Sequence, residues 1–187
     1  MKFKVYKQKS NRNFGNECEE KLAEIEASGE RPSLLLHACC APCSSYCLEY
    51  LSPYFDITVF FYNPNMDTEA EFVHRASELE RFVDAAGYDA KVTIESYEPQ
   101  KFYSAVRGLE AAPEGGARCF KCYELRLKRT AKYAAENGFD YFTTTLSISP
   151  HKNAAVLNEI GERLGFEYGV RFLPSDFKKK DGFKRSI

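Results

Sequence analysis

Cysteine carries most of the metal and redox chemistry open to this 187-residue chain, and six of its seven cysteines fall into two groups. The first group is the stretch of residues 39–47, CCAPCSSYC, and the second is the CxxC pair of Cys119 and Cys122. Thiolates are preferred ligands of zinc and of iron–sulfur clusters, and two separated cysteine groups can complete such a site in the fold. We expect the first group at a strand-to-helix turn, where backbone N–H groups and the helix dipole stabilise thiolates.

Three kinds of cysteine chemistry remain open on spacing alone. Cys40 and Cys43 after a strand are typical of a thioredoxin-like redox motif, although that chemistry needs neither Cys39 nor the second pair. A structural zinc site would take the two CxxC pairs and leave Cys39 idle. An iron–sulfur cluster accepts four thiolates at variable spacings and frees a fifth cysteine for a second metal or the substrate. Spacing gives the zinc site and the cluster equal weight.

The composition fits a cytoplasmic enzyme with one sizeable core. Hydrophobic residues make up 44% of the chain and charged residues 28%, as is usual for soluble globular proteins. No apolar run reaches about 18 residues and the N-terminus lacks a signal-peptide pattern, so no membrane partner is expected. Clustered cysteines in a reducing compartment indicate metal or redox chemistry more often than disulfides. The net charge of −1 means that nucleic-acid binding would depend on two basic segments, 118–132 and 171–185.

Alternating strand and helix signals predict one α/β catalytic domain, residues 32–187, after a partly helical N-terminal extension, residues 1–31. The sheet is expected to be mostly parallel and covered by helices on both faces, in a Rossmann-like or HUP-like arrangement. Strands are expected at residues 33–38, 57–62, 91–96 and 140–146. Helices are expected at residues 44–51, about 72–86, about 119–137 and 153–164, with a weak helix at 18–27.

Polar residues follow three of the four expected strands. Cys39–Cys43 follow the first strand, Asn63 and Asn65 the second, and the segment 147–153, SISPHKN, the fourth. Ligands of open α/β sheets bind outside the carboxyl ends of the strands. The convergence of three polar segments on that edge predicts a single site there.

The chain from about residue 16 to its end resembles the QueH family of epoxyqueuosine reductases. The motifs that carry this resemblance are LLHACCAPCSS at 35–45, YEP at 97–99, RGLE at 107–110, PEGGARC at 113–119, LSISPHKN at 146–153, LPSDFKK at 173–179 and GFKRS at 182–186. Members of the family usually continue past the Lys-Arg-Ser motif with a segment containing Tyr-Cys-Gly-Cys. The sequence stops at Ile187 before this tail, either because it is truncated or because the natural protein lacks the tail, so the residues present leave open what the tail supplies, such as closure of the site.

The resemblance implies the last step of queuosine formation, in which the epoxide on the modified wobble base of tRNAs with GUN anticodons is reduced to an alkene. It also implies a [4Fe–4S] cluster with an adjacent metal ion (a mononuclear iron), no cobalamin, and an external electron donor. Removing the epoxide oxygen takes two electrons and two protons and releases water. Zinc has no redox change and cannot supply such electrons. The alternative is a zinc-binding or thioredoxin-like cysteine protein without tRNA-modifying activity.

Residue roles follow from the resemblance and from the expected sheet edge. Cys39, Cys40, Cys119 and Cys122 are expected to bind the cluster, and Cys43 to bind the second metal as a catalytic residue; some family members have Asp at that position. Cys43 as a cluster ligand in place of Cys39 or Cys40 is the alternative. The remaining site predictions are a catalytic role for His151, base contacts from Asn63, Asn65 and Ser149, and phosphate contacts from Arg118, Arg126, Lys152 and Lys178. Arg75, on the helix after the second expected strand, suits a phosphate contact or solvated surface equally. His37 suits a core or a site role equally, and Cys18 and Cys47 are expected to be incidental.

Overall fold

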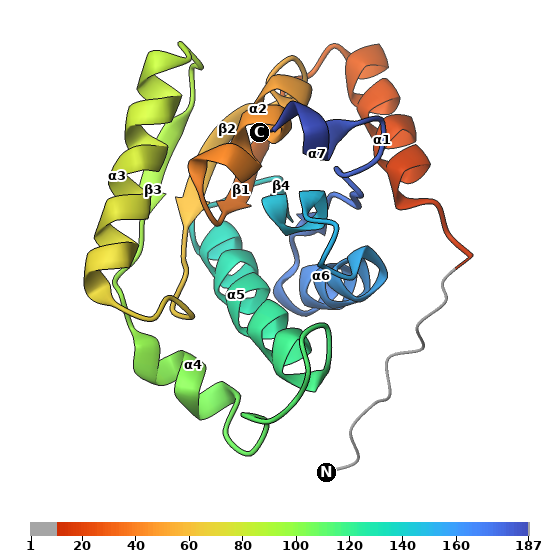
Figure 1. The fold of residues 1–187 in the computed structure, drawn as a ribbon. Helices are drawn as coiled ribbons and strands as arrows, with labels where there is room; N and C mark the ends of the chain where they lie inside the picture. The colour runs from red at the N-terminus through yellow and green to blue at the C-terminus, as the bar shows by residue number, and fades with distance from the viewer. Residues whose placement is uncertain (1–10, 187) are drawn as a thin grey trace.

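Five parallel strands form one sheet at the centre of the fold, in a computed structural model that describes residues 11–186 (Figure 1). The strands are β1 (Ser33–Ala38), β2 (Asp56–Phe61), β3 (Lys91–Ile94), β4 (Tyr141–Thr144) and β5 (Arg171–Phe172), in the order β3-β2-β1-β4-β5. The central strand β1 pairs with β2 on one side and β4 on the other. The predicted parallel α/β fold is therefore confirmed.

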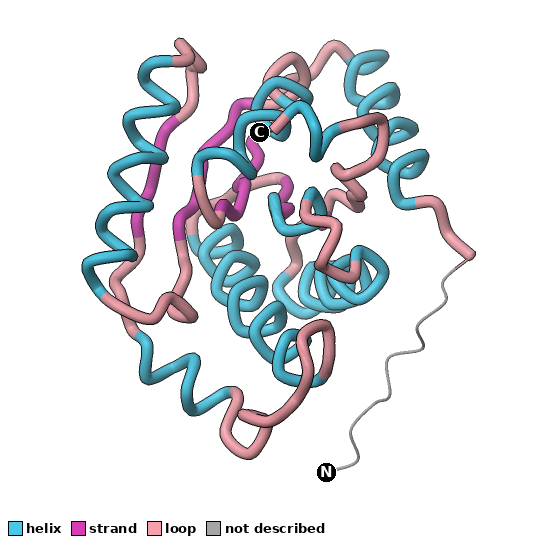
Figure 2. The backbone as a smooth tube through the Cα atoms, viewed as in Figure 1, coloured by secondary structure: helices cyan, strands magenta, loops and turns pink. Residues whose placement is uncertain are grey.

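Helices cover both faces of this sheet (Figure 2). They are α1 (Phe14–Ser28), α2 (Ala41–Leu51), α3 (Glu69–Ala85), α4 (Pro99–Ala105), α5 (Ala117–Glu136), α6 (Ala154–Tyr168) and α7 (Gly182–Arg185), with a 3-10 turn η1 (Thr145–Ile148) directly after β4. Of the helices in residues 11–186, none combines the length and the apolar character needed to span a membrane.

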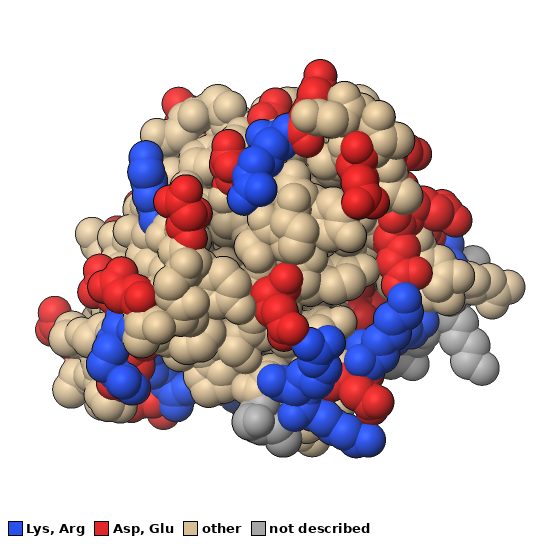
Figure 3. Space-filling model, turned by 90° about the horizontal axis from the view of Figure 1, so that it is seen from above, with Lys and Arg blue, Asp and Glu red and all other residues tan. Residues whose placement is uncertain are grey.

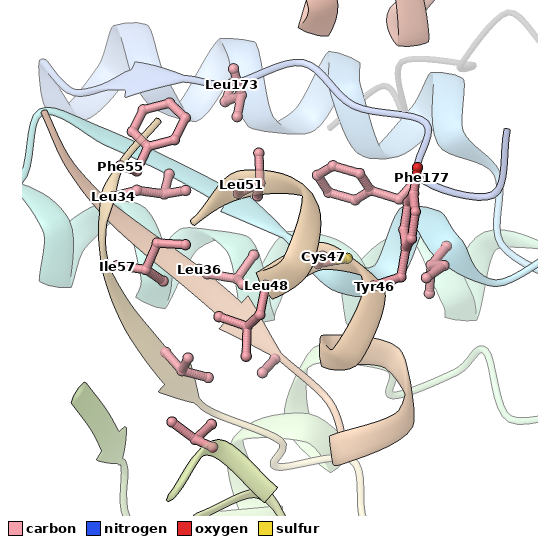
Figure 4. Close-up of a cluster of buried hydrophobic side chains, with 14 of the residues drawn as sticks. Leu34, Leu36, Tyr46, Cys47, Leu48, Leu51, Phe55, Ile57, Leu173 and Phe177 are labelled. Atoms are coloured by element: carbon pink, nitrogen blue, oxygen red, sulfur yellow. The ribbon is translucent and has the colours of Figure 1, made fainter. Parts of the chain in front are cut away.

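Two hydrophobic cores lie on opposite faces of the sheet, because successive side chains of a strand point to opposite faces. In β1, Leu34 and Leu36 enter the first core, which α1, α2 and α3 cover, whereas Leu35 enters the second, under α5 and α6. Figure 4 shows the first core, where Leu48 and Leu51 of α2 pack against the β1 leucines. Both faces of β1 are thus fixed, and with them the position of the loop that follows it.

Several elements differ from their predicted bounds for local reasons. Helix α2 begins at Ala41 rather than Ser44 because Pro42 is compatible with a first helical turn, where its missing N–H has no helical partner. Cys43 is consequently helical. The fourth strand ends at Thr144, and Thr145 starts the 3-10 turn instead of extending the strand. Helix α4 and strand β5 were not predicted. Helix α4 buries no residue, and β5 is only two residues long.

Helix α1 is longer than the weak helix predicted at residues 18–27, and one of its faces is buried. Phe14, Cys18, Leu22 and Ile25 form that face, at helical spacing. Cys18 is only 2% exposed and lies in the first core. Cys47 is also in that core and fully buried, as Figure 4 shows. Both cysteines therefore pack as hydrophobic side chains.

Candidate metal and substrate site

The first cysteine group lies where β1 passes into α2, beside the end of β4. After β1 the chain adds β2 and β3 on one side of that strand. It then crosses over and adds β4 and β5 on the other side. Such a switch in the strand order opens a crevice at the carboxyl edge, and ligands of α/β sheets bind there. Cys39 Sγ bridges the two strand ends, since it lies 3.7 Å from Thr145 Oγ1 in η1.

Three thiols meet at this crevice. The Sγ atoms of Cys39, Cys40 and Cys43 all lie within 4.8 Å of one another, and Cys39 Sγ is 3.7 Å from Cys40 Sγ. Cys40 caps α2 with an extended backbone (φ −172°, ψ 167°), and Cys43 follows in the first turn of the helix. All three residues are partly buried and their thiols are free. Their spacing suits ligands of a common metal centre.

The three thiols differ in acidity. Hydrogen bonds from the Cys40 and Cys43 thiols hold the pKa of Cys39 well below its usual range, and the nearby Arg126 charge and Thr145 hydroxyl add to this effect against the cost of burial. The pKa values of Cys40 and Cys43 are raised mainly through the same hydrogen bonds. Cys39 is therefore the most acidic of the three thiols, and its two neighbours act as hydrogen-bond donors that a bound metal would replace.

The second cysteine pair lies at the N-terminus of α5. Cys119 and Cys122 are three residues apart, so they occupy one face of the helix. Helix α5 leads into the parallel strand β4, which places its N-terminal end at the carboxyl edge of the sheet. Cys119 and Cys39 both pack against the second core, and the Gly115 backbone N–H donates to Cys119 Sγ at 3.3 Å.

The structure brings the two cysteine groups to one edge without merging them. Among residues 11–186, the tight sulfur group comprises Cys39, Cys40 and Cys43, and it does not include Cys119 or Cys122. The alternative in which Cys43 is a cluster ligand therefore stays open beside the predicted set.

A layer of buried polar side chains lies beneath the thiols. His37 is fully buried, with Nδ1 2.8 Å from Thr144 Oγ1 and Nε2 3.1 Å from the Tyr62 carbonyl. Nε2 faces the Tyr62 carbonyl, which only accepts, and also accepts from Arg126 Nε at 3.4 Å, so these two contacts require different tautomers of the ring. Burial first, and then the charge of Arg126, lowers the pKa of His37 to about 3. The imidazole is a neutral core group, which favours the core role over the site role.

Asn63 and Arg126 complete this layer. Asn63 is 1% exposed; its Nδ2 donates to the Ala38 carbonyl at 3.0 Å, and its Oδ1 accepts from Arg126 Nη2. Both ends of the amide are thus occupied by protein groups, so the predicted base contact would require Asn63 to give up one of them. Arg126 is 3% exposed. The predicted phosphate contact from Arg126 does not fit this burial, because the guanidinium points under the thiols instead of toward the surface.

The other predicted substrate residues are more accessible. Asn65 is partly exposed as a residue, but its Oδ1 atom is buried and has no hydrogen-bond partner among the described residues. His151 is exposed, and its backbone N–H donates to Ser149 Oγ at 3.3 Å. The Lys152 backbone N–H donates to the Ser149 carbonyl at 3.2 Å. These contacts order the loop between η1 and α6, which follows β4 at the same edge as the cysteines.

Two predicted phosphate contacts engage protein groups at the surface. Arg118 Nη1 reaches the Glu110 carbonyl at 3.4 Å. Lys178 Nζ pairs with Asp176 Oδ1 at 2.8 Å. Neither arrangement buries the side chain fully, so both residues remain candidates for an RNA surface.

Thr145 lies beside the thiols without having been predicted as a site residue, and Arg75, which suited a phosphate contact or solvated surface equally, lies near them as well. Thr145 was assigned to the interior of a strand, but its hydroxyl faces Cys39. Arg75 of α3 lies close enough to the thiols for their charge to raise its pKa, although its bond to Glu71 has the larger effect. No short sequence motif marks either residue; only the packing of α3 and η1 around α2 reveals them.

Comparisons with known proteins agree with this arrangement. The family described as "Epoxyqueuosine reductase QueH" matches residues 34–187. A protein of that name from Staphylococcus epidermidis is 44% identical over 94% of this chain and 76% of its own length. One from Streptococcus pyogenes is also 44% identical, over 90% of this chain and 68% of its own length. One from Thermotoga maritima is 31% identical over 83% of this chain and 80% of its own length. The match includes both cysteine groups and every strand of the sheet, and the chain belongs to the QueH family of epoxyqueuosine reductases.

Proposed function

We propose that this chain reduces epoxyqueuosine at the wobble position of tRNA to queuosine without cobalamin. The observation that carries the proposal is the three-thiol group at the switch point of the sheet, within the segment that matches the reductase family. The reaction consumes two electrons and two protons and releases water, and an external donor must supply the electrons. Three free cysteines within bonding reach of one centre, one of them with a lowered pKa, suit an electron-transferring metal centre at this position.

The donor set fits a [4Fe–4S] cluster with a second metal. The cluster requires four thiolates, and the carboxyl edge offers five cysteines. Cys39, Cys40, Cys119 and Cys122 would hold the cluster, and Cys43 in the first turn of α2 would hold a mononuclear iron. When bound, such a cluster supplies single electrons. A zinc site of four thiolates accounts for neither the fifth cysteine nor a redox reaction.

The accessible residues around the thiols suit the substrate. Asn65 has a buried amide oxygen without a protein partner, which would reach a base once the side chain turns outward, and Ser149 lies on the ordered loop after β4 at the same sheet edge. We assign these two residues to contacts with the modified base. Asn63 is buried and keeps its bonds to the Ala38 carbonyl and to Arg126. His151 is exposed on the same loop and is the candidate proton donor, because histidine is the usual general acid near neutral pH. Lys152 and Arg118 flank the site and are assigned to phosphates.

An activity measurement tests this proposal. Protein loaded with iron and sulfide without oxygen is given a chemical reductant and tRNA bearing epoxyqueuosine, and the nucleosides are analysed by mass spectrometry. We expect the epoxyqueuosine signal to be replaced by a product lacking one oxygen atom. Unchanged substrate at full cluster loading would contradict the proposal. Equal efficiency on the free nucleoside would instead indicate a small-molecule reductase.

The affinity for tRNA is expected to depend steeply on salt, although the surface charge is mixed. Figure 3 shows acidic and basic side chains interspersed over one face of the molecule. Many basic residues of the two predicted segments form ion pairs, such as Arg129 with Glu95 and Lys180 with Glu19. RNA contacts therefore depend on the few cations near the site. Each phosphate neutralised adds about 0.7–0.9 to the slope of log affinity against log salt concentration.

Lys152→Gln should reduce that slope by about one phosphate contact while leaving metal content unchanged. Lys91→Gln is the matched control, because Lys91 is equally a lysine but starts β3 at the opposite, amino edge of the sheet. Filter binding at several salt concentrations measures the slope. An affinity independent of salt, or equal slope changes in the two variants, would refute the proposed RNA surface.

A further inference from the structure

The guanidinium of Arg126 is a buried positive charge that the protein does not neutralise. Arg126 is 3% exposed, and no carboxylate lies within ion-pair distance of it among residues 11–186. Its Nη2 donates to the amide oxygen of Asn63 and its Nε donates to His37 Nε2 at 3.4 Å, so both of these partners are uncharged. A buried charge without a counter-ion is costly, so such a group usually has an anionic partner.

The arrangement of α5 makes this burial specific. Arg126 lies on the helix face formed by Tyr123, Leu127 and Thr130, which packs against the second core. Arg129, one turn further along the same helix, is partly exposed and bonds Glu95 Oε2 at 2.6 Å. The chain thus neutralises the arginine near the surface with a carboxylate, whereas it holds the buried arginine with a neutral amide.

The anion nearest to this charge is the thiol site. Arg126 reaches under the end of β1 through Asn63, which bonds the Ala38 carbonyl directly before Cys39. A four-iron cluster bound by four thiolates carries a net negative charge that increases by one on reduction, so a fixed cation beside it favours the reduced state.

We propose that Arg126 is the buried counter-charge of the metal centre and sets its reduction potential, with Asn63 holding the guanidinium in place. The proposal rests on the iron–sulfur centre of the proposed function. Arg126 is a positioning residue in this role, because it acts on the cofactor through charge and contacts neither the substrate nor the metals directly.

Arg126→Gln removes the charge and keeps a hydrogen-bond donor for Asn63 Oδ1. We expect the midpoint potential of the reconstituted cluster, measured by anaerobic redox titration, to become more negative. The expected change is about tenfold in the equilibrium constant for one-electron reduction, which corresponds to about 59 mV. Arg129→Gln is the matched control: it removes one arginine charge from the same helix, but one turn further from the thiols and in contact with solvent, which screens the change, so the potential should stay nearly unchanged.

Two further variants separate charge from structure. Asn63→Asp places a carboxylate against an intact Arg126 and should lower the potential as Arg126→Gln does. Arg126→Lys keeps the charge and should keep the wild-type potential. If Arg126→Gln loses its cluster, retention in Arg126→Lys still supports the charge role, whereas loss in both variants would show a purely structural role and overturn it.

The outcomes distinguish this inference from the proposed function. Wild-type protein without an iron–sulfur cluster would overturn both. A cluster-loaded wild type with unshifted potentials in Arg126→Gln and Asn63→Asp would overturn only the role of Arg126. An equal shift in Arg129→Gln would likewise show that no specific buried charge is involved.

Discussion

Replacing Cys119 or Cys122 with serine is expected to remove the iron–sulfur cluster and all reductase activity. Both cysteines lie in the first turns of α5, and no other cysteine of the described chain lies on that helix to replace either one. A cluster held by only three thiolates is rarely stable, and a neutral hydroxyl is a poor ligand for iron. Iron content and turnover of tRNA bearing epoxyqueuosine measure the effect in anaerobically purified variants.

Cys18→Ala is the control for these two variants. Cys18 is buried in the first core, on the face of the sheet opposite α5, so alanine avoids burying a hydroxyl without a partner. We expect this variant to lose about 1 kcal/mol of stability and to keep its iron and its activity. Bleaching of Cys18→Ala, or full iron in Cys119→Ser, would show that the ligand assignment is wrong.

Cys43→Ala is expected to keep the cluster and to lose turnover by about 100-fold. This cysteine lies against the first core at the start of α2 and is assigned to the second metal rather than to the cluster. A metal that polarises a departing oxygen contributes several kcal/mol, and each factor of ten in rate corresponds to about 1.4 kcal/mol. The iron content should fall by about one atom per chain, and kcat on the tRNA substrate should fall in parallel.

Cys43→Asp provides the matching test, because a carboxylate also binds iron at this position without supplying a thiolate. It should restore most of the turnover that Cys43→Ala loses. If Cys43→Ala instead loses the whole cluster and Cys43→Asp does not recover it, Cys43 is a cluster ligand. That result would favour the alternative in which it replaces Cys39 or Cys40.

Local sequence patterns were sufficient to predict the frame of this site. The apolar run of β1 and the β-branched, aromatic run of β2 have the composition of buried parallel strands, and both were placed to within one residue. Parallel strands bring their carboxyl ends to one edge, so the thiols of residues 39–43 and the loop after β4 converge as predicted. Elements as short as β5, by contrast, contain too few residues for any periodic pattern.

The buried polar layer was not predicted, because it depends on contacts between distant elements. Arg126 was grouped with the basic residues around it, although it shares a helical face with the apolar residues Tyr123 and Leu127. That spacing was the available signal, since an arginine on a buried face needs a partner. Its partner Asn63 lies 63 residues away, after β2, and no local pattern links the two.

The metal and sulfide content of the protein purified without oxygen tests the central claim most directly. We expect brown protein with about four sulfide ions and four to five iron atoms per chain, as a four-iron cluster with one further iron requires. Colourless protein holding one zinc would contradict it and favour the structural zinc site. Metal-free protein that reduces disulfides through Cys40 and Cys43 would contradict it as well, and would favour thioredoxin-like chemistry.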